Sequence, residues 1–250
     1  MIALVHHDAV KCAAPTLKSL GYTVLIWGTP LETKSIDGEY LRHKLQNDGR
    51  YGVKEFTKLL AYTLVDYPVV VLLDLDVLVM KQMDNLGVQV GFDNPIKSSH
   101  YDSSKGINSF FTRDYNIADN TMTHVAAQRG LLVIEPSLLA YDNFLSIIRH
   151  GDYRKGARWT GLGYGESPGS TTFQELIPYY YDHFHPGTGI ELNRCVYNNI
   201  ADSPRENNDG SGSCKDGHNR SGKIDKCEDC RSCPIDEVSK KNDHTVCKNL

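Results

Sequence analysis

The sequence has no long hydrophobic run and no concentration of basic residues, and each absence excludes a class of protein. Within its 250 residues no stretch of about 18 apolar residues occurs, so nothing in it is expected to span a membrane. The formal net charge is -4 with no basic face, which excludes nucleic acid as an expected partner. Ile2–Val5 resembles the first strand of a fold and lacks the regions of a signal peptide, so we expect any targeting or membrane segment to lie upstream.

Hydrophobic residues are common enough for a globular protein. They make up 40% of the chain, which favours one main domain with a substantial core. We predict that this domain covers residues 1–201. Residues 202–250 are rich in Asn, Asp, Ser, Gly and Lys and have few apolar side chains, so they should form a polar tail that cannot build a core alone.

Two carboxylates interrupt the most apolar stretch of the chain, Val69–Met80. Its first five residues show no alternation, which predicts a central parallel strand that is covered on both faces and ends near Asp74. Side chains two apart on an extended chain point the same way, so Asp74 and Asp76 should bind one metal ion at the carboxyl edge of the sheet. Because unpaired buried charges are costly, two carboxylates here imply a compensating cation.

The remaining patterns predict an α/β fold. Ile2–Val5 and Val24–Trp27 are expected strands, separated by a helix over residues 13–20 that Gly21 ends, which makes a βαβ unit. Lys58 lies off the apolar stripe of a further helix that precedes the Asp-containing strand. That stripe consists of Phe56, Leu59, Leu60, Thr63 and Leu64.

The second half of the chain continues the alternation of strands and helices. Residues 93–123 are expected to form a loop-rich insertion, and Leu131–Ile134 a buried strand. A helix should begin at Ser137 and end at Gly151, and Gly161–Ser170 should be a mobile or ligand-approaching loop. The expected buried face of that helix consists of Leu138, Tyr141, Leu145 and Ile148.

Taken together, these features resemble glycosyltransferase family 8, the glycogenin-like nucleotide-sugar transferases, in its eukaryotic secretory type. The resemblance extends from Met1 to about Arg205. It implies a GT-A fold, which is a Rossmann-like mixed, mostly parallel sheet flanked by helices, with an irregular Cys-rich tail. It also implies Mn²⁺ or Mg²⁺, a UDP-sugar donor and retention of anomeric configuration. The matching segments are Gly21–Val24, Lys54–Leu59, Asp74–Asp76, Gly130–Ser137, Phe173–Gln174, Asp182–Thr188 and Asn193–Asn199.

The resemblance also implies roles for individual residues. The Asp pair holds the metal, which stabilises charge on the departing phosphate, and Asp74 also touches the ribose. Lys58 reaches the donor sugar or phosphate, although it could equally be a solvated helix-face lysine. Gln128 and Gln174 contact donor or acceptor, or are ordinary surface groups. The predicted set comprises the catalytic residues Gln174 and Lys58, the donor-binding residues Asp74, Asp76, Lys58, Asp8, Gln128 and Lys248, and the metal ligands Asp74, Asp76 and His244.

The sequence departs from the family pattern at three places. Phe173 stands where the family usually has Asp, which favours transfer on the donor's front face, with the departing phosphate taking the acceptor proton. Arg129 replaces a usually small residue and either senses an anion or points outward. In the family, a late segment that runs from a metal-binding His to a Lys-Pro-Trp motif supplies a metal ligand and a phosphate-binding lysine. Here the corresponding segment, His244–Lys248, is shorter and lacks Pro-Trp, so it is truncated, misjoined or decayed. His244 is therefore either a metal ligand or merely exposed.

Five of the seven cysteines fall in the polar tail. We expect disulfides there, because the three-residue spacing of Cys227, Cys230 and Cys233 lacks a matching fourth partner for zinc or an iron–sulfur cluster. Asn219–Ser221 is a glycosylation acceptor pattern. These features and the resemblance predict the Golgi or the secretory lumen, with the cytoplasm as the alternative.

Two other functions compete with the transferase. A haloacid-dehalogenase-like phosphatase also ends an apolar strand in Asp-x-Asp, but Leu78 stands where Thr or Val is wanted and no second Asp follows Gly151-Asp152 at the required spacing. A degenerate domain that binds a nucleotide sugar without turnover is the other alternative. For the transferase, the acceptor can be a glycan, a protein or a lipid, and the sequence identifies neither it nor the sugar.

Overall fold

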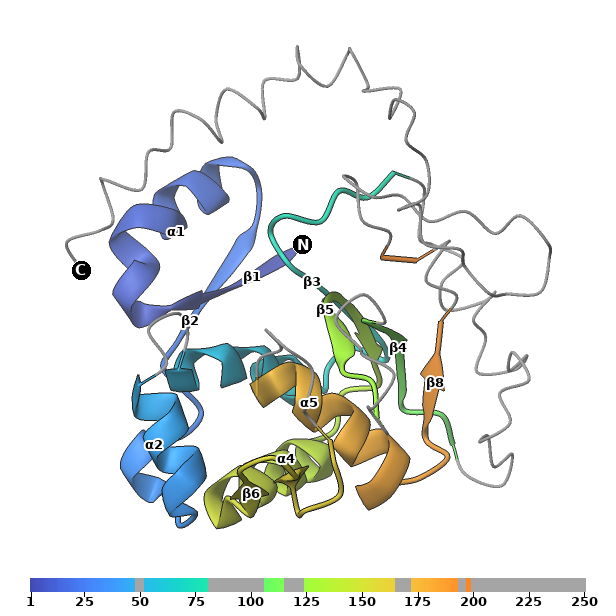
Figure 1. Ribbon diagram of the computed structural model, residues 1–250. Coiled ribbons are helices and arrows are strands. Elements are labelled where there is room, and N and C mark those ends of the chain that lie inside the picture. The colour runs from blue at the N-terminus through green and yellow to red at the C-terminus, as the bar shows by residue number, and fades with distance from the viewer. Residues whose placement is uncertain (48–51, 81–105, 115–123, 165–171, 193–196, 199–250) are drawn as a thin grey trace, which may run out of the picture. The chain divides into compact units, whose positions relative to one another are not determined.

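The structure is a computed structural model that describes residues 1–47, 52–80, 106–114, 124–164, 172–192 and 197–198 (Figure 1). The chain divides into a unit that contains Met1–Trp27 and a unit of Gly28–Asn199, and each is described by itself. In the described ranges, no helix has the length and apolar character needed to cross a membrane. The predicted tail, with His244, Lys248 and its cysteines, lies outside the described residues.

The first unit is the predicted βαβ motif. It consists of β1 (Ile2–His6), the 3₁₀ turn η1 (His7–Ala9), α1 (Val10–Ser19) and β2 (Thr23–Trp27). β1 and β2 pair in parallel, from Ile2 opposite Thr23 to His6 opposite Trp27, and α1 packs on both. Gly21 follows the helix with a φ of 86°, a left-handed conformation that glycine adopts without steric cost. The prediction is therefore confirmed, with α1 beginning earlier than expected.

The second unit is built on a sheet of mixed strand orientation. Its strands are β3 (Val70–Leu73), β4 (Ser109–Arg113), β5 (Ala127–Ile134) and β8 (Gly189–Glu191), in the order β3-β5-β4-β8. β5 runs antiparallel to both β3 and β4, while β4 and β8 are parallel. Three of the four strands therefore share one direction, and the α/β fold with a mixed sheet flanked by helices is confirmed at this level.

Two sequence-based expectations about this sheet are wrong. β3 is not a central parallel strand. Within the described residues it is an edge strand that pairs antiparallel with β5, and it is half-buried. An apolar run without alternation indicates burial but carries no information about strand direction. The second wrong expectation is the loop over residues 93–123, since β4 lies inside it. The sequence pattern missed this strand because its buried apolar residues, Phe110 and Phe111, have polar neighbours and form too short an apolar run.

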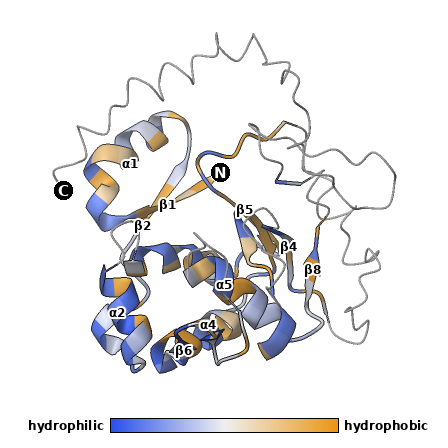
Figure 2. Ribbon diagram, in the orientation of Figure 1, coloured by the Kyte–Doolittle hydropathy of each residue, from blue (hydrophilic) through white to orange (hydrophobic). Residues whose placement is uncertain are grey.

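Helices cover this sheet and pack on one another (Figure 1). The described elements are η2 (Thr33–Ser35), α2 (Glu39–Asn47), the 3₁₀ helix η3 (Gly52–Thr63), α4 (Leu138–His150), α5 (Thr172–Pro178), the π-helical η4 (Tyr179–Phe184) and the hairpin β6 (Tyr153–Arg154) and β7 (Arg158–Trp159). α5 packs on β5 and η3, and η3 also contacts β3, α2 and α4. Most of α2 is hydrophilic (Figure 2), and its buried Leu41 and Leu45 anchor it. The helix predicted before β3 is confirmed and ends at Thr63.

α4 has the ends that its sequence predicts. The Ser137 side chain accepts a hydrogen bond from the Ala140 N–H at 3.2 Å, and Gly151 ends the helix in the left-handed conformation. The expected buried face is partly wrong, because Leu138 is 55% exposed whereas Phe144 is fully buried. The buried residues of α4 are Phe144, Leu145 and Ile148, which all lie beyond its first turn, so its first residue is left in solvent.

An aromatic cluster joins η3, α4 and η4. The Phe144 ring centroid lies 5.1 Å from that of Tyr62 and 4.0 Å from that of Tyr180. The hydroxyls of Tyr62 and Tyr181 share a hydrogen bond of 2.9 Å, and burial raises the pKa of both phenols. These contacts fix η3, which carries Lys58, relative to the rest of the unit.

Candidate functional site

The candidate site lies where β3 ends. The Asp74 N–H donates to the Gly130 carbonyl at 3.2 Å, and the Val77 N–H donates to the Asp74 carbonyl at 3.1 Å. Asp74 and Asp76 are thus the first and third residues of a turn. The expectation that the two side chains follow one extended strand is wrong, because the chain turns directly after Leu73. Asp76 is exposed, and the Asp74 side chain is 21% exposed.

Two cationic side chains meet the Asp74 carboxylate. Lys58 of η3 donates to Oδ1, and the Arg129 Nε of β5 lies 3.8 Å from Oδ2. The Lys58 Nζ also lies 3.4 Å from the Arg129 carbonyl oxygen. The structure therefore brings together Lys58 and Asp74, both predicted as site residues, and adds Arg129, which the sequence marked only as a departure from the family pattern.

The start of α5 contributes packing to this site. Phe173 is buried, with its ring centroid 5.8 Å from the Lys58 Nζ. Gln174 is also buried, and its Nε2 donates to the Ala127 carbonyl at 3.2 Å. Gln128 is half-buried in β5, and its Oε1 is buried without a hydrogen bond from any described residue. Gln174 thus ties α5 to the first residue of β5.

A buried carboxylate that sequence reasoning missed holds α5 in place. Glu175 is 1% exposed, accepts a hydrogen bond from the Tyr153 hydroxyl and lies 4.0 Å from the Lys44 Nζ. Lys44 also donates to the Tyr153 hydroxyl at 2.9 Å. Burial, and then the Glu175 charge, raise the pKa of Tyr153, which keeps this phenol a donor. No local signal predicted the network, because its members come from α2, β6 and α5.

Close backbone packing supports the turn that carries Asp74. A Cβ added to Gly130 would lie 2.7 Å from Asn198 Oδ1 and 3.2 Å from Val77 Cγ2, so a larger residue here would displace one of them. Asn198 in turn donates to the Thr112 hydroxyl at 3.1 Å. Gly130 and Asn198 both belong to segments that carry the family resemblance, but their contact was visible only in three dimensions.

Three further predicted residues, Asp8, His244 and Lys248, belong to other parts of the chain. Asp8 belongs to the Met1–Trp27 unit, where its carboxylate lies 3.4 Å from His6 Nδ1 and 3.0 Å from His7 Nε2. His244 and Lys248 lie outside the described residues.

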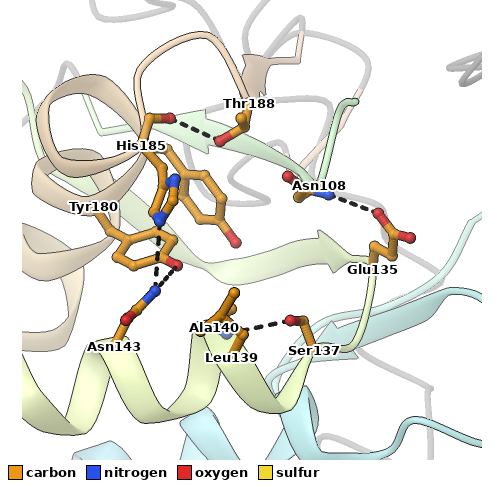
Figure 3. A pocket seen from close by; sticks show the side chains of 10 residues that line it. Asn108, Glu135, Ser137, Leu139, Ala140, Asn143, Tyr180, His185 and Thr188 are labelled. Atoms are coloured by element: carbon orange, nitrogen blue, oxygen red, sulfur yellow. Dashed lines mark hydrogen bonds between the residues drawn. The ribbon is translucent and has the colours of Figure 1, made fainter. Parts of the chain in front are cut away.

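Figure 3 shows a separate cavity of about 220 Å³. It is bordered by Asn108 before β4 and Glu135 after β5, which are joined by a hydrogen bond of 2.6 Å. Asn143 of α4 and Tyr180 of η4 point toward each other beside it, at 3.4 Å. The register places Val70 opposite Ile134, so this cavity is near the start of β3 and away from Asp74.

Comparison of the chain with protein-family models, with curated proteins and with solved structures finds no match.

Proposed function

We propose that this chain is a metal-dependent glycosyltransferase with a GT-A fold, which moves a hexose from a UDP-sugar to an acceptor with retention of anomeric configuration. The observation that carries the proposal is the contact of Asp74 with two cations, Lys58 and Arg129, at the end of β3. Acidic groups that suit a divalent ion therefore lie beside basic groups that suit a diphosphate.

The charge balance of the site supports ligands that enter together. The formal charges of Asp74 and Asp76 equal in number those of Lys58 and Arg129, and Asp74 is the carboxylate that both cations contact. A divalent cation and the diphosphate of a UDP-sugar also balance each other, so their joint entry keeps the site neutral, whereas either alone leaves an uncompensated charge. Lys58 and Arg129 would then leave the Asp74 carboxylate and bind phosphate oxygens instead, which ammonium and guanidinium groups bind well.

Asp74 and Asp76 are the described residues that would hold Mn²⁺ or Mg²⁺. Both carboxylates fit this role, because they are hard oxygen donors and each is accessible from solvent at the turn. When bound, the ion would supply Lewis-acid stabilisation of the departing diphosphate. His244 as a third ligand and Lys248 as a phosphate ligand belong to the same proposal.

The residues of α5 support a front-face transfer. Phe173 packs near Lys58, and the carboxylate of Glu175 is buried against Tyr153, so neither provides a nucleophile beside Asp74. In the proposed step, the bond between the anomeric carbon and the phosphate oxygen breaks as the acceptor oxygen bonds to that carbon on the same face. The acceptor proton passes to the departing phosphate oxygen. The enzyme contributes position and charge stabilisation. Trapping of a glycosyl-enzyme adduct would contradict this route.

The direct test is UDP release from a panel of UDP-sugars in the presence of Mn²⁺. We expect one sugar donor to be turned over, and we expect Asp76→Asn to abolish this turnover without loss of the fold. Asp66→Asn is the matched control, because Asp66 is an exposed aspartate in the turn before β3. Wild-type rates in Asp76→Asn protein would refute the proposed site.

The second candidate is a domain that binds a nucleotide sugar without turnover. It is favoured by Gln174, which is buried with its amide nitrogen bonded to the Ala127 carbonyl and so acts in packing. In the same assay, Mn²⁺-dependent UDP binding without UDP release would support this candidate. Release of phosphate alone would instead support the phosphatase.

The proposed setting is the Golgi or secretory lumen. Cys12 of α1 is disulfide-bonded, which supports an oxidising compartment. The proposed partners are the nucleotide-sugar donor and a glycan, protein or lipid acceptor. Digestion of a secreted form with a glycosidase would test whether Asn219 carries a glycan, as a lumenal protein would.

A further inference from the structure

We propose that the turn after β1 is a binding site for Zn²⁺, formed by His6, His7 and Asp8. Each residue offers one ligand atom, and these atoms all lie within 4.8 Å of one another. The site lies in the Met1–Trp27 unit and does not depend on the transferase proposed above.

The local fold explains why three consecutive side chains converge. Neighbouring side chains on a strand point to opposite faces, so a continued β1 would separate His6 from His7. The chain instead passes from extended backbone at His6 directly into the 3₁₀ turn η1 (Figure 1). This change of direction brings the two imidazole rings side by side, with centroids 4.1 Å apart, and places Asp8 against both.

The distances suit a small coordination shell. Asp8 Oδ2 lies 3.4 Å from His6 Nδ1, and Asp8 Oδ1 lies 3.0 Å from His7 Nε2. Ligands bound at about 2.0–2.1 Å to one tetrahedral or octahedral ion are separated by about 3.0–3.4 Å. Small side-chain rotations that bring the two nitrogens closer would therefore complete the site.

The donor chemistry selects the kind of ion. Two imidazole nitrogens and one carboxylate favour Zn²⁺ and its transition-metal neighbours over Mg²⁺ or Ca²⁺, which prefer oxygen. The His7 and Asp8 side chains are 60% and 46% exposed, whereas that of His6 is 13% exposed. Three protein ligands with an open side leave positions for water, as in zinc sites that are not closed by a fourth residue.

The local hydrogen bonding is compatible with this site. The His6 Nδ1 accepts the Asp8 N–H at 3.3 Å, so its lone pair already faces the turn and a metal would replace that weak hydrogen bond. Zn²⁺ requires neutral imidazole, and accepting a hydrogen bond at Nδ1 is what a neutral ring does. Cys12 is disulfide-bonded and does not compete as a ligand.

The test is a titration of the full chain with Zn²⁺ by calorimetry, and with Co²⁺ as a spectroscopic substitute. We expect one equivalent to bind with a Co²⁺ spectrum of nitrogen and oxygen ligands, without the sulfur-to-cobalt charge transfer that tail cysteines would give. His7→Ala and Asp8→Asn should each lower Zn²⁺ affinity more than tenfold, since even loss of an outer-shell partner costs about 10–100-fold.

His150→Ala is the matched control, because His150 is an exposed histidine outside this unit. It should bind Zn²⁺ like the wild type, and all variants should keep the wild-type circular dichroism. Unchanged affinity in His7→Ala and Asp8→Asn, binding through thiolates alone, or no stoichiometric binding would each overturn the proposal. An equal loss in His150→Ala would overturn it as well.

Discussion

Replacement of Lys58 by methionine tests whether the cation beside Asp74 serves catalysis or stability. Methionine keeps an unbranched apolar side chain against Phe173 and removes only the ammonium group. Asp74 retains Arg129 at 3.8 Å, and its side chain is still reached by water at 21% exposure. The ion pair is therefore not isolated from solvent, and we expect Lys58→Met to lower the free energy of unfolding by about 1 kcal/mol or less.

The expected effect on turnover is much larger. In the proposed reaction the Lys58 ammonium faces charge that grows on the departing diphosphate. Removal of one preorganised donor of this kind typically lowers kcat by about 10²–10³-fold, or about 2.7–4 kcal/mol. The loss in activity should therefore clearly exceed the loss in stability, which a purely structural ion pair cannot produce.

Two measurements on the same protein separate these contributions. Mn²⁺-dependent UDP release gives kcat and KM, and urea unfolding gives the free energy of unfolding. Lys155→Met is the matched control, because Lys155 is an exposed lysine in the β6–β7 hairpin, away from Asp74. If Lys58→Met protein released UDP at nearly the wild-type rate, the catalytic role of this lysine would be refuted.

Three further predictions concern stability and pH. Phe144→Ala should lower the free energy of unfolding by about 3–5 kcal/mol in urea unfolding, because this ring is fully buried in the aromatic cluster; a loss near zero would contradict its place there. Glu175→Gln should cost about 1.5–3 kcal/mol in the same assay, since it weakens a buried hydrogen bond from Tyr153 to a charged group; unchanged stability would show that the charge is dispensable. Burial lowers the pKa of His124, which stacks on Tyr164, so the neutral ring stabilises the fold above about pH 6.5, and this contribution is lost as the pH falls through the lowered pKa. His124→Phe should therefore flatten the decline of the melting temperature below that pH, and an unchanged decline would contradict the shift.

The sequence determined the elements that local chemistry defines. Ser137 caps the start of α4, Gly151 ends that helix, and Gly21 ends α1. These ends follow from the sequence because helix capping and left-handed backbone depend on residues within one turn. The apolar runs of β3 and β5 marked strands for the same local reason, although β5 is largely buried and β3 only half-buried. The expectation that Lys58 and Asp74 share a site came from the family resemblance and stays a prediction, while the structure shows that the Lys58 ammonium donates a hydrogen bond to the Asp74 carboxylate.

Tertiary structure alone decided how these elements combine. β3 pairs antiparallel with β5, and β4 enters the sheet through Phe110 and Phe111, because strand pairing depends on partners more than 20 residues away along the chain. The meeting of Arg129 with Asp74 has the same long-range origin. Hydrophobic pattern and capping signals specify which segments are buried or helical. The neighbours of a charged side chain are instead set by packing between segments that are far apart in the sequence.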